Sequence, residues 1–167
     1  MSDDQMLRST PWLRRVSRSA SFASFFLRAE SLFNVATTAE QLGLGQYGWA
    51  ALHDKSHGEA FLWVLEERFG PNGLYILDEP EAALSPQRRL AALAIFRRLV
   101  RTGSQLVIAT HSPILMGYPG ACLYRLDGSG IARVAYEDTE HYAVTRGFLT
   151  AHESYLKHLF EEENGEE

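Results

Sequence analysis

The chain has 167 residues, a length typical of one domain, and 46% of them are hydrophobic, which is enough to build a core. Its net charge of −5 comes from the acidic end, because residues 161–167 hold five Glu and the two signs balance in the rest. This balance leaves nucleic-acid binding open without supporting it. The single cysteine, Cys122, excludes an internal disulfide and a cysteine-based zinc site. The single cysteine also fits a reducing, cytoplasmic location. No apolar run reaches membrane-spanning length, so we expect no membrane insertion.

Three segments are predicted from the composition. Residues 1–20 are basic, polar and serine-rich, and we expect them to be disordered. Residues 21–160 are expected to fold as one unit. Residues 161–167 are expected to form a solvated acidic tail.

The first half of the folded unit mixes apolar and glycine-rich stretches. Phe22–Leu27 predicts a strand that leaves into a loop at Glu30 and Ser31. A helix is predicted over 33–42. The following Gly43-Leu44-Gly45-Gln46-Tyr47-Gly48 has the spacing of a dinucleotide fingerprint, but a helical stretch precedes it where a strand is required, so we assign it no cofactor.

A strand–helix–strand unit occupies the middle of the chain. The short apolar run Leu74–Leu77 predicts a buried parallel strand. Ser85-Pro86 then begins a long helix, since Ser is a good N-cap and Pro is favoured in the first turn. Gln105–Ala109 predicts a second strand, parallel to the first because a long crossover separates them.

The last third predicts a β-hairpin and helices. The segments 122–126 and 131–136 flank Asp127-Gly128-Ser129-Gly130, a turn sequence typical of hairpins. Residues 139–160 predict one or two helices.

Two carboxylates follow the first buried strand. Asp78 and Glu79 come at its carboxyl end, which is where ligands bind in open α/β sheets. Successive strand residues point to opposite faces, so one carboxylate can hold Mg²⁺ while the other activates a water molecule. The alternative is a solvated strand end whose acid caps a helix.

His111 follows the next parallel strand and is therefore expected at the same edge as Asp78 and Glu79. A histidine there can hydrogen-bond a terminal phosphate. The alternative for Thr110-His111-Ser112-Pro113 is a turn in which Ser112 caps a short helix.

The segment Ser56-His57-Gly58-Glu59 has Ser three residues before Glu, the pattern of a capping box that starts a helix predicted to end near Phe69. The same geometry offers free N–H groups to an anion, and Gly58 would let a phosphate approach closely. Both interpretations stay open.

These pieces together resemble the ATP-binding-cassette (ABC) ATPases, in order and spacing. Leu74–Pro80 resembles the Walker B motif with its catalytic Glu, Ala83–Pro86 the D-loop, and Thr110–Ser112 the switch-histidine loop. Ser56–Glu59 is similar to the signature motif, and Phe26–Glu30 to the Q-loop region with Glu30 in place of Gln. The segment Glu79–Pro86 is closer to the soluble ATPases of the AAA type than to transporter cassettes.

The resemblance implies a site and cofactors. Asp78 would hold Mg²⁺, Glu79 would polarise the attacking water, and His111 would contact the γ-phosphate of ATP. Ser56, His57, Gly58, Glu59 and Ser85 would bind a nucleotide in trans, since family members hydrolyse ATP at a head-to-tail dimer interface. Ser85 stands where many members carry Asp.

The resemblance also implies a fold: a partial, ABC-type P-loop NTPase of α/β class. It would have three layers with parallel strands, a helical signature subdomain over about 33–70, and the C-terminal β-hairpin. The phosphate-binding motif G-x-x-x-x-G-K-[ST] is absent from the 167 residues. We therefore expect weak or no ATP hydrolysis by the chain alone, and an exposed apolar face or edge on its sheet.

Three functions follow as hypotheses. The first is an ATP-hydrolysing domain, truncated or split, that works with a missing half carrying Walker A or with another ATPase domain. The second is a non-catalytic remnant that docks on an intact ATPase. The third is a transporter cassette, which would need a membrane partner.

Overall fold

The computed structural model describes residues 24–32, 52 and 55–163. The predicted disorder of 1–20, the helix 33–42 and the glycine-rich stretch 43–48 lie outside the described residues.

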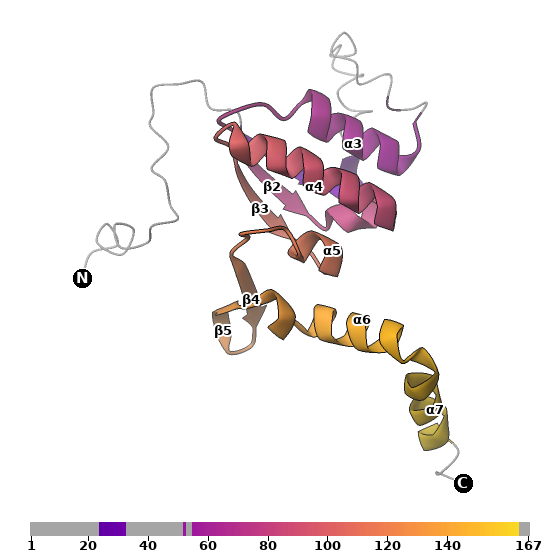
Figure 1. Ribbon diagram of the computed structural model, residues 1–167. Helices are drawn as coiled ribbons and strands as arrows, with labels where there is room; N and C mark the ends of the chain where they lie inside the picture. Colours follow the sequence, from indigo (N-terminus) through magenta and orange to yellow (C-terminus); the bar gives the residue numbers. More distant parts are fainter. Residues whose placement is uncertain (1–23, 33–51, 53–54, 164–167) are drawn as a thin grey trace, which may run out of the picture.

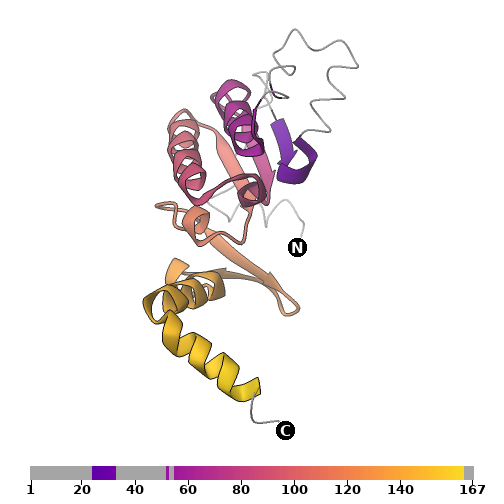
Figure 2. The same ribbon diagram turned by 90° about the vertical axis from the view of Figure 1, so that its right-hand side faces the viewer.

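Three parallel strands form the central sheet, in the order β1 (Ser24–Arg28), β2 (Leu74–Asp78) and β3 (Gln105–Ala109). Figure 1 labels β2 and β3, and β1 is the indigo strand in Figure 2. The predicted strands are confirmed, including the parallel pairing of β2 with β3. The predicted loop after β1 is wrong: residues Ala29–Ser31 form a 3-10 helix, η1. The tight turn brings Ala29 and Leu32 into the core, which a loop leaving the sheet would not do.

Two helices cover one face of this sheet (Figures 1 and 2): α3 (His57–Glu67) and α4 (Pro86–Arg101). Both begin where their caps predict. The Ser85 hydroxyl accepts a hydrogen bond from the Arg88 N–H at 3.4 Å, as an N-cap does. The two helices run in the same direction. An Arg88–Glu59 ion pair joins their first turns, and Arg98 donates to the Glu66 carbonyl near their ends.

The core lies between the sheet and these helices. It is centred on the buried Tyr75 and Leu77 of β2, which pack with buried residues of both helices: Phe61, Val64, Leu65, Ala92, Ile95, Phe96 and Leu99. The Tyr75 ring stacks on Phe69 with centroids 4.0 Å apart, and its hydroxyl donates to the Gly70 carbonyl and accepts from the Gly70 N–H. A Cβ at Gly73 would overlap the hydroxyl end of the buried Tyr75 ring, so a larger residue there would displace that ring.

The opposite face of the sheet is open. Phe26, Ile76 and Val107 stand side by side across the three strands and are 65%, 39% and 49% exposed. The prediction that Leu74–Leu77 is buried is therefore wrong for this face, since the described helices α3 and α4 both pack on the other one. The expectation of an exposed apolar face is confirmed for the described residues.

The chain continues through α5 (Pro113–Met116) into the antiparallel strands β4 (Leu123–Asp127) and β5 (Gly130–Val134). The 3-10 helix η5 (Tyr136–Asp138), α6 (Glu140–Thr150) and α7 (His152–Glu163) follow, so α7 runs three residues into the predicted acidic tail.

These last elements project away from the sheet (Figures 1 and 2). We call residues 24–32, 52 and 55–118 the sheet unit, and residues 119–163 the C-terminal unit. Within the described side chains, Leu115 is the last buried residue.

Candidate functional site

The carboxyl edge of β2 carries the two predicted carboxylates. Asp78 is the last residue of β2, and Glu79 is the N-cap of a 3-10 helix, η4 (Pro80–Ala83). Glu79 has φ 47° and ψ 52°, a left-handed conformation that costs a residue with a side chain about 1–2 kcal/mol. Its N–H donates to the Ala109 carbonyl at 2.9 Å, which anchors the turn to the end of β3. The sheet therefore holds Glu79 in a backbone conformation that the residue does not favour.

Asp78 has a partner that sequence reasoning missed. Arg28 of β1 lies opposite Asp78 in the strand register, and its Nε is 3.1 Å from Asp78 Oδ2. Both side chains are partly exposed, so the pair itself stabilises the fold by at most about 1 kcal/mol. It does place a permanent positive charge beside the predicted magnesium ligand.

His111 follows β3 and lies at this edge. Its Nε2 is 3.9 Å from Glu79 Oε1, and the two side chains are 70% and 45% exposed. Its Nδ1 is 3.0 Å from Nε2 of His141 on α6. The structure thus brings Asp78, Glu79 and His111 together at one edge of the sheet.

Glu81 is a further residue of this edge to which sequence reasoning gave no role. Its carboxylate accepts hydrogen bonds from the Thr110 hydroxyl at 2.6 Å and from the His111 backbone N–H at 2.5 Å. It therefore fixes the loop that carries His111 to the turn that carries Glu79. The signal was a third acid two residues after Glu79, but only the 3-10 turn directs it toward β3.

Ser112 behaves differently from its predicted capping role. It occupies the N-cap position of α5, yet its side chain makes no capping hydrogen bond, and its buried Oγ has no hydrogen-bond partner. The Thr110 hydroxyl instead accepts from the Ser112 N–H at 3.0 Å.

The segment Ser56–Glu59 lies at a second location, where the first turns of α3 and α4 meet. The Ser56 N–H and hydroxyl both donate to the Glu59 carboxylate, at 3.0 and 2.6 Å. These bonds, with the nearby Arg88 guanidinium, lower the pKa of the Glu59 carboxyl below its usual value. The capping role of this segment is thereby confirmed.

Gly58 is buried at the contact between the two helices. A Cβ there would lie 2.8 Å from Arg88 Cδ and 2.9 Å from the Ala83 carbonyl oxygen. In this structure its lack of a side chain serves helix packing, whereas Ser56, His57 and Glu59 are outward-facing. Ser85 begins α4 beside them, and Glu30 is exposed on η1, which packs against η4.

The described residues do not form a complete set of protein ligands for a magnesium ion. No group of three or more His, Cys, Asp or Glu side chains in residues 24–32, 52 and 55–163 is arranged to hold a metal. Asp78 Oδ2 lies 3.1 Å from Arg28 Nε, so part of this carboxylate already faces a positive charge. A single carboxylate still suits Mg²⁺ that is bound mainly by phosphate oxygens and water.

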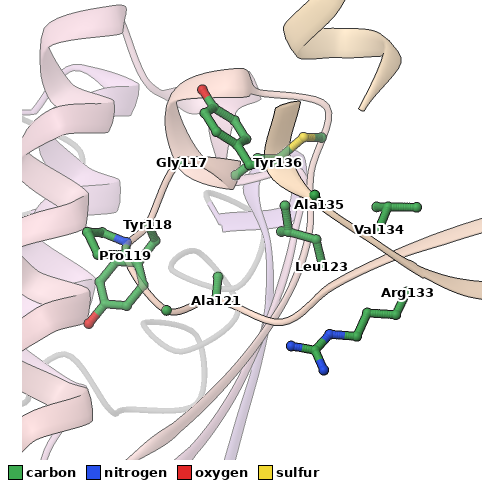
Figure 3. Close-up of a pocket in the computed structure, with 11 residues that line it drawn as sticks. Gly117, Tyr118, Pro119, Ala121, Leu123, Arg133, Val134, Ala135 and Tyr136 are labelled. Carbon is green, nitrogen blue, oxygen red and sulfur yellow. The ribbon is translucent and has the colours of Figure 1, made fainter. Parts of the chain in front are cut away.

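A pocket of about 550 Å³ lies elsewhere, where α5 meets the β4–β5 hairpin (Figure 3). Its lining includes Tyr118, Leu123, Arg133 and Tyr136, and the Tyr136 hydroxyl donates to the Pro113 carbonyl at 2.8 Å. None of the predicted site residues lines it.

Part of the chain matches a known protein family. Residues 49–117, less than half of the chain, match the family described as "AAA domain, putative AbiEii toxin, Type IV TA system". The match covers β2, β3 and the edge residues Asp78, Glu79 and His111. It supports an AAA-type, P-loop ATPase-like domain with a nucleotide-binding, ATPase-like function, and the parallel three-stranded sheet is compatible with that fold. No curated protein and no solved structure matches the chain.

The helices in residues 24–32, 52 and 55–163 are too short or too polar to span a membrane.

Proposed function

We propose that this chain supplies the Walker B, switch-histidine and signature parts of an ABC-type domain that binds and hydrolyses ATP. The observation that carries the proposal is the meeting of Asp78, Glu79 and His111 at the carboxyl edge of one parallel sheet. Ligands of such sheets bind at that edge. The strained backbone of Glu79 adds support, because strain of this kind concentrates at functional sites.

In this proposal each edge residue has one task. Glu79, whose side chain is half-exposed at the end of β2, accepts the proton of the attacking water or orients it. His111 donates from its ring to the γ-phosphate. Glu81 holds the backbone of His111, so that the histidine stays in reach of Glu79.

Asp78 would hold Mg²⁺ through a carboxylate oxygen while Arg28 stays at its Oδ2. When bound, the ion neutralises charge on the phosphates. Arg28 would remain beside the same phosphates as a second positive charge.

The contact of the first turns of α3 and α4 is the proposed trans site. Ser56, His57 and Glu59 with Ser85 face outward there at two helix N-termini, whose dipoles favour an anion. Gly58 contributes by letting the two helices meet closely. The nucleotide bound there would belong to a partner in a head-to-tail dimer.

The phosphates themselves require a phosphate-binding loop, and we propose that a segment outside these 167 residues supplies it. The open sheet face supports this part of the proposal. Parallel sheets are normally covered on both faces, and Phe26, Ile76 and Val107 are exposed together. A segment bearing the loop and its helix would cover them.

The test is reconstitution with a segment that contains G-x-x-x-x-G-K-[ST], supplied as a separate chain. Co-expressed with it, the chain should give Mg²⁺-dependent ATP turnover, while the chain alone gives little or none. Glu79→Gln should lower kcat by about 10²–10⁴-fold because the water loses its base, with nucleotide affinity retained. The matched control is Glu153→Gln, an exposed acid on α7.

Two results would contradict the proposal. One is equal turnover by wild type and Glu79→Gln, and the other is vigorous turnover by the purified 167-residue chain. Ile76→Lys, on the open face, should also break the co-purified assembly, whereas Leu126→Lys, exposed on the β-hairpin, should leave it intact.

A second candidate is a non-catalytic module that docks on an intact ATPase. It is favoured by the ion pairs and hydrogen bonds that Asp78 and Glu59 make within this chain. Asp78 is paired with Arg28, and Glu59 is held by Ser56 and Arg88, so both are satisfied without nucleotide. This candidate predicts binding to an ATP-loaded partner that Glu79→Gln leaves unchanged, with no contribution to turnover.

A further inference from the structure

A contact between two histidines joins the candidate site to the C-terminal unit. His111 Nδ1 and His141 Nε2 are 3.0 Å apart, and the ring centroids are 5.0 Å apart. His141 lies in the first turn of α6, beyond the residues 49–117 that match the AAA family. The 3.0 Å separation is a hydrogen-bond distance, so one ring donates and the other accepts.

The surroundings of His111 decide which ring donates. Its other nitrogen, Nε2, faces the Glu79 carboxylate at 3.9 Å, and a carboxylate can only accept. If His111 Nδ1 donated to His141, the neutral His111 Nε2 would present a lone pair to this negative charge. If His141 Nε2–H donates instead, His111 carries its proton on Nε2, where the carboxylate attracts it.

We propose that His141 is a positioning residue that holds the His111 ring with its Nε2–H directed to the site. In this state His111 presents a hydrogen-bond donor beside Glu79, as a contact to a phosphate oxygen requires. The inference rests on the proposed function for its consequence, but the hydrogen bond itself is a property of the chain alone.

Three hydrogen bonds place the start of α6 next to the loop that carries His111. The Thr139 hydroxyl, at the N-cap, accepts from the Tyr142 N–H at 3.4 Å and donates to the Tyr136 carbonyl at 2.7 Å. The Tyr136 hydroxyl in turn donates to the Pro113 carbonyl, two residues after His111. His111 is therefore fixed from two sides, at its backbone by Glu81 and at its ring by His141.

The direct test is NMR of the full chain with ¹⁵N-labelled histidine, at a pH where both rings are neutral. We expect wild-type His111 to be protonated on Nε2, with the Nδ1 resonance shifted as a hydrogen-bond acceptor. His141→Phe should move that resonance to the position of a free acceptor. His141→Gln should restore it, because the Gln amide places a donor near the position of His Nε2. His158→Phe, an exposed histidine on α7, is the control and should change nothing at His111.

Two outcomes would overturn the inference. One is a His111 spectrum that is identical in wild type and His141→Phe. The other is wild-type His111 protonated on Nδ1, a result that needs no variant and so stands even if His141→Phe does not fold.

Turnover in the reconstituted assembly gives the second readout. His141→Phe should lower kcat about fivefold, the equivalent of one hydrogen bond of about 1 kcal/mol, with KM unchanged, and His141→Gln should recover most of it. An assembly with no turnover at all would count against the proposed function while the NMR result still decides the role of His141. Unchanged kcat in His141→Phe, in an active assembly, would overturn the positioning role.

Discussion

The sheet unit and the C-terminal unit are stabilised in different ways. In the sheet unit, residues far apart in sequence meet in one core, with Tyr75 and Leu77 buried between α3, α4 and the strands. In the C-terminal unit every described side chain is exposed or only partly buried, and the contacts are mostly local. Examples are the Thr139 cap, the Asp127–Ser129 turn and the packing of Phe148 against Tyr155.

This difference in packing explains why the candidate site residues lie on the sheet unit. A strained residue such as Glu79 needs a rigid support, and the sheet provides it through the hydrogen bond to Ala109. The C-terminal unit reaches the site through a few contacts, chiefly His141 with His111 and Tyr136 with Pro113. It can therefore open locally at small cost, while the sheet unit unfolds as a whole.

The largest expected effect is on the free energy of unfolding, and it differs between two leucines that both lie in helices. Leu65 of α3 is 0% exposed, and Leu149 of α6 is 73% exposed. Leu65→Ala should lower the free energy of unfolding by about 2–5 kcal/mol because it leaves a cavity in the core. Leu149→Ala should change it by less than about 0.5 kcal/mol. Urea unfolding followed by circular dichroism measures both, and similar losses would remove the contrast between the units.

The next effect compares two helix glycines. Gly58→Ala should cost about 1–3 kcal/mol, because its Cβ would meet the Ala83 carbonyl and the Arg88 side chain at the helix contact. At Gly147 of α6 the Cβ would meet only the end of the Tyr155 side chain, which is exposed and can rotate.

Gly147→Ala should therefore be neutral or stabilise α6 by up to about 1 kcal/mol, the helix preference of Ala over Gly. Amide hydrogen exchange resolves the two units separately. Destabilisation of both by the same amount would show that α6 is packed as tightly as α3.

A smaller effect concerns the backbone of Glu79. Glu79→Gly should be more stable than Glu79→Ala by about 1 kcal/mol, since only glycine adopts a φ of 47° without strain. The same pair at Glu140, the first residue of α6, should show the opposite order, because that backbone is helical. Thermal unfolding measures the stability difference between the Gly and Ala variants at each site. If Ala were the more stable variant at both sites, the backbone of Glu79 would be unstrained.

The smallest effect is a pH dependence. Hydrogen bonds from Ser56 lower the pKa of Glu59, so its contribution to stability is present above the pKa of the unfolded chain and is lost as pH falls through the folded-state pKa. Glu59→Gln should flatten the acid side of the stability profile of the sheet unit.

Asp127 is the counterpart in the C-terminal unit. Hydrogen bonds from Ser129 lower its pKa in the same direction. Asp127→Asn should leave the acid profile of the sheet unit unchanged, because its contacts stay within the β-hairpin. Hydrogen exchange at several pH values tests the pair, and a sheet-unit profile altered by Asp127→Asn would show that the units unfold together.

The sequence by itself determined the local elements and part of the site. Short apolar runs identified β2 and β3, and the caps Ser56 and Ser85 located the starts of α3 and α4, because these signals act within a few residues. The sequence also predicted that Asp78 and His111 share one edge of the sheet, because the carboxyl ends of neighbouring parallel strands lie at the same edge.

Only the tertiary structure decided what those residues touch. Arg28 reaches Asp78 because β1 pairs with β2 in one register, and Gly58 is needed because α4 packs on α3. Glu81 and His141 converge on His111 from positions about thirty residues away on either side. Such contacts depend on packing between distant segments, and no local pattern of residue types carries that information.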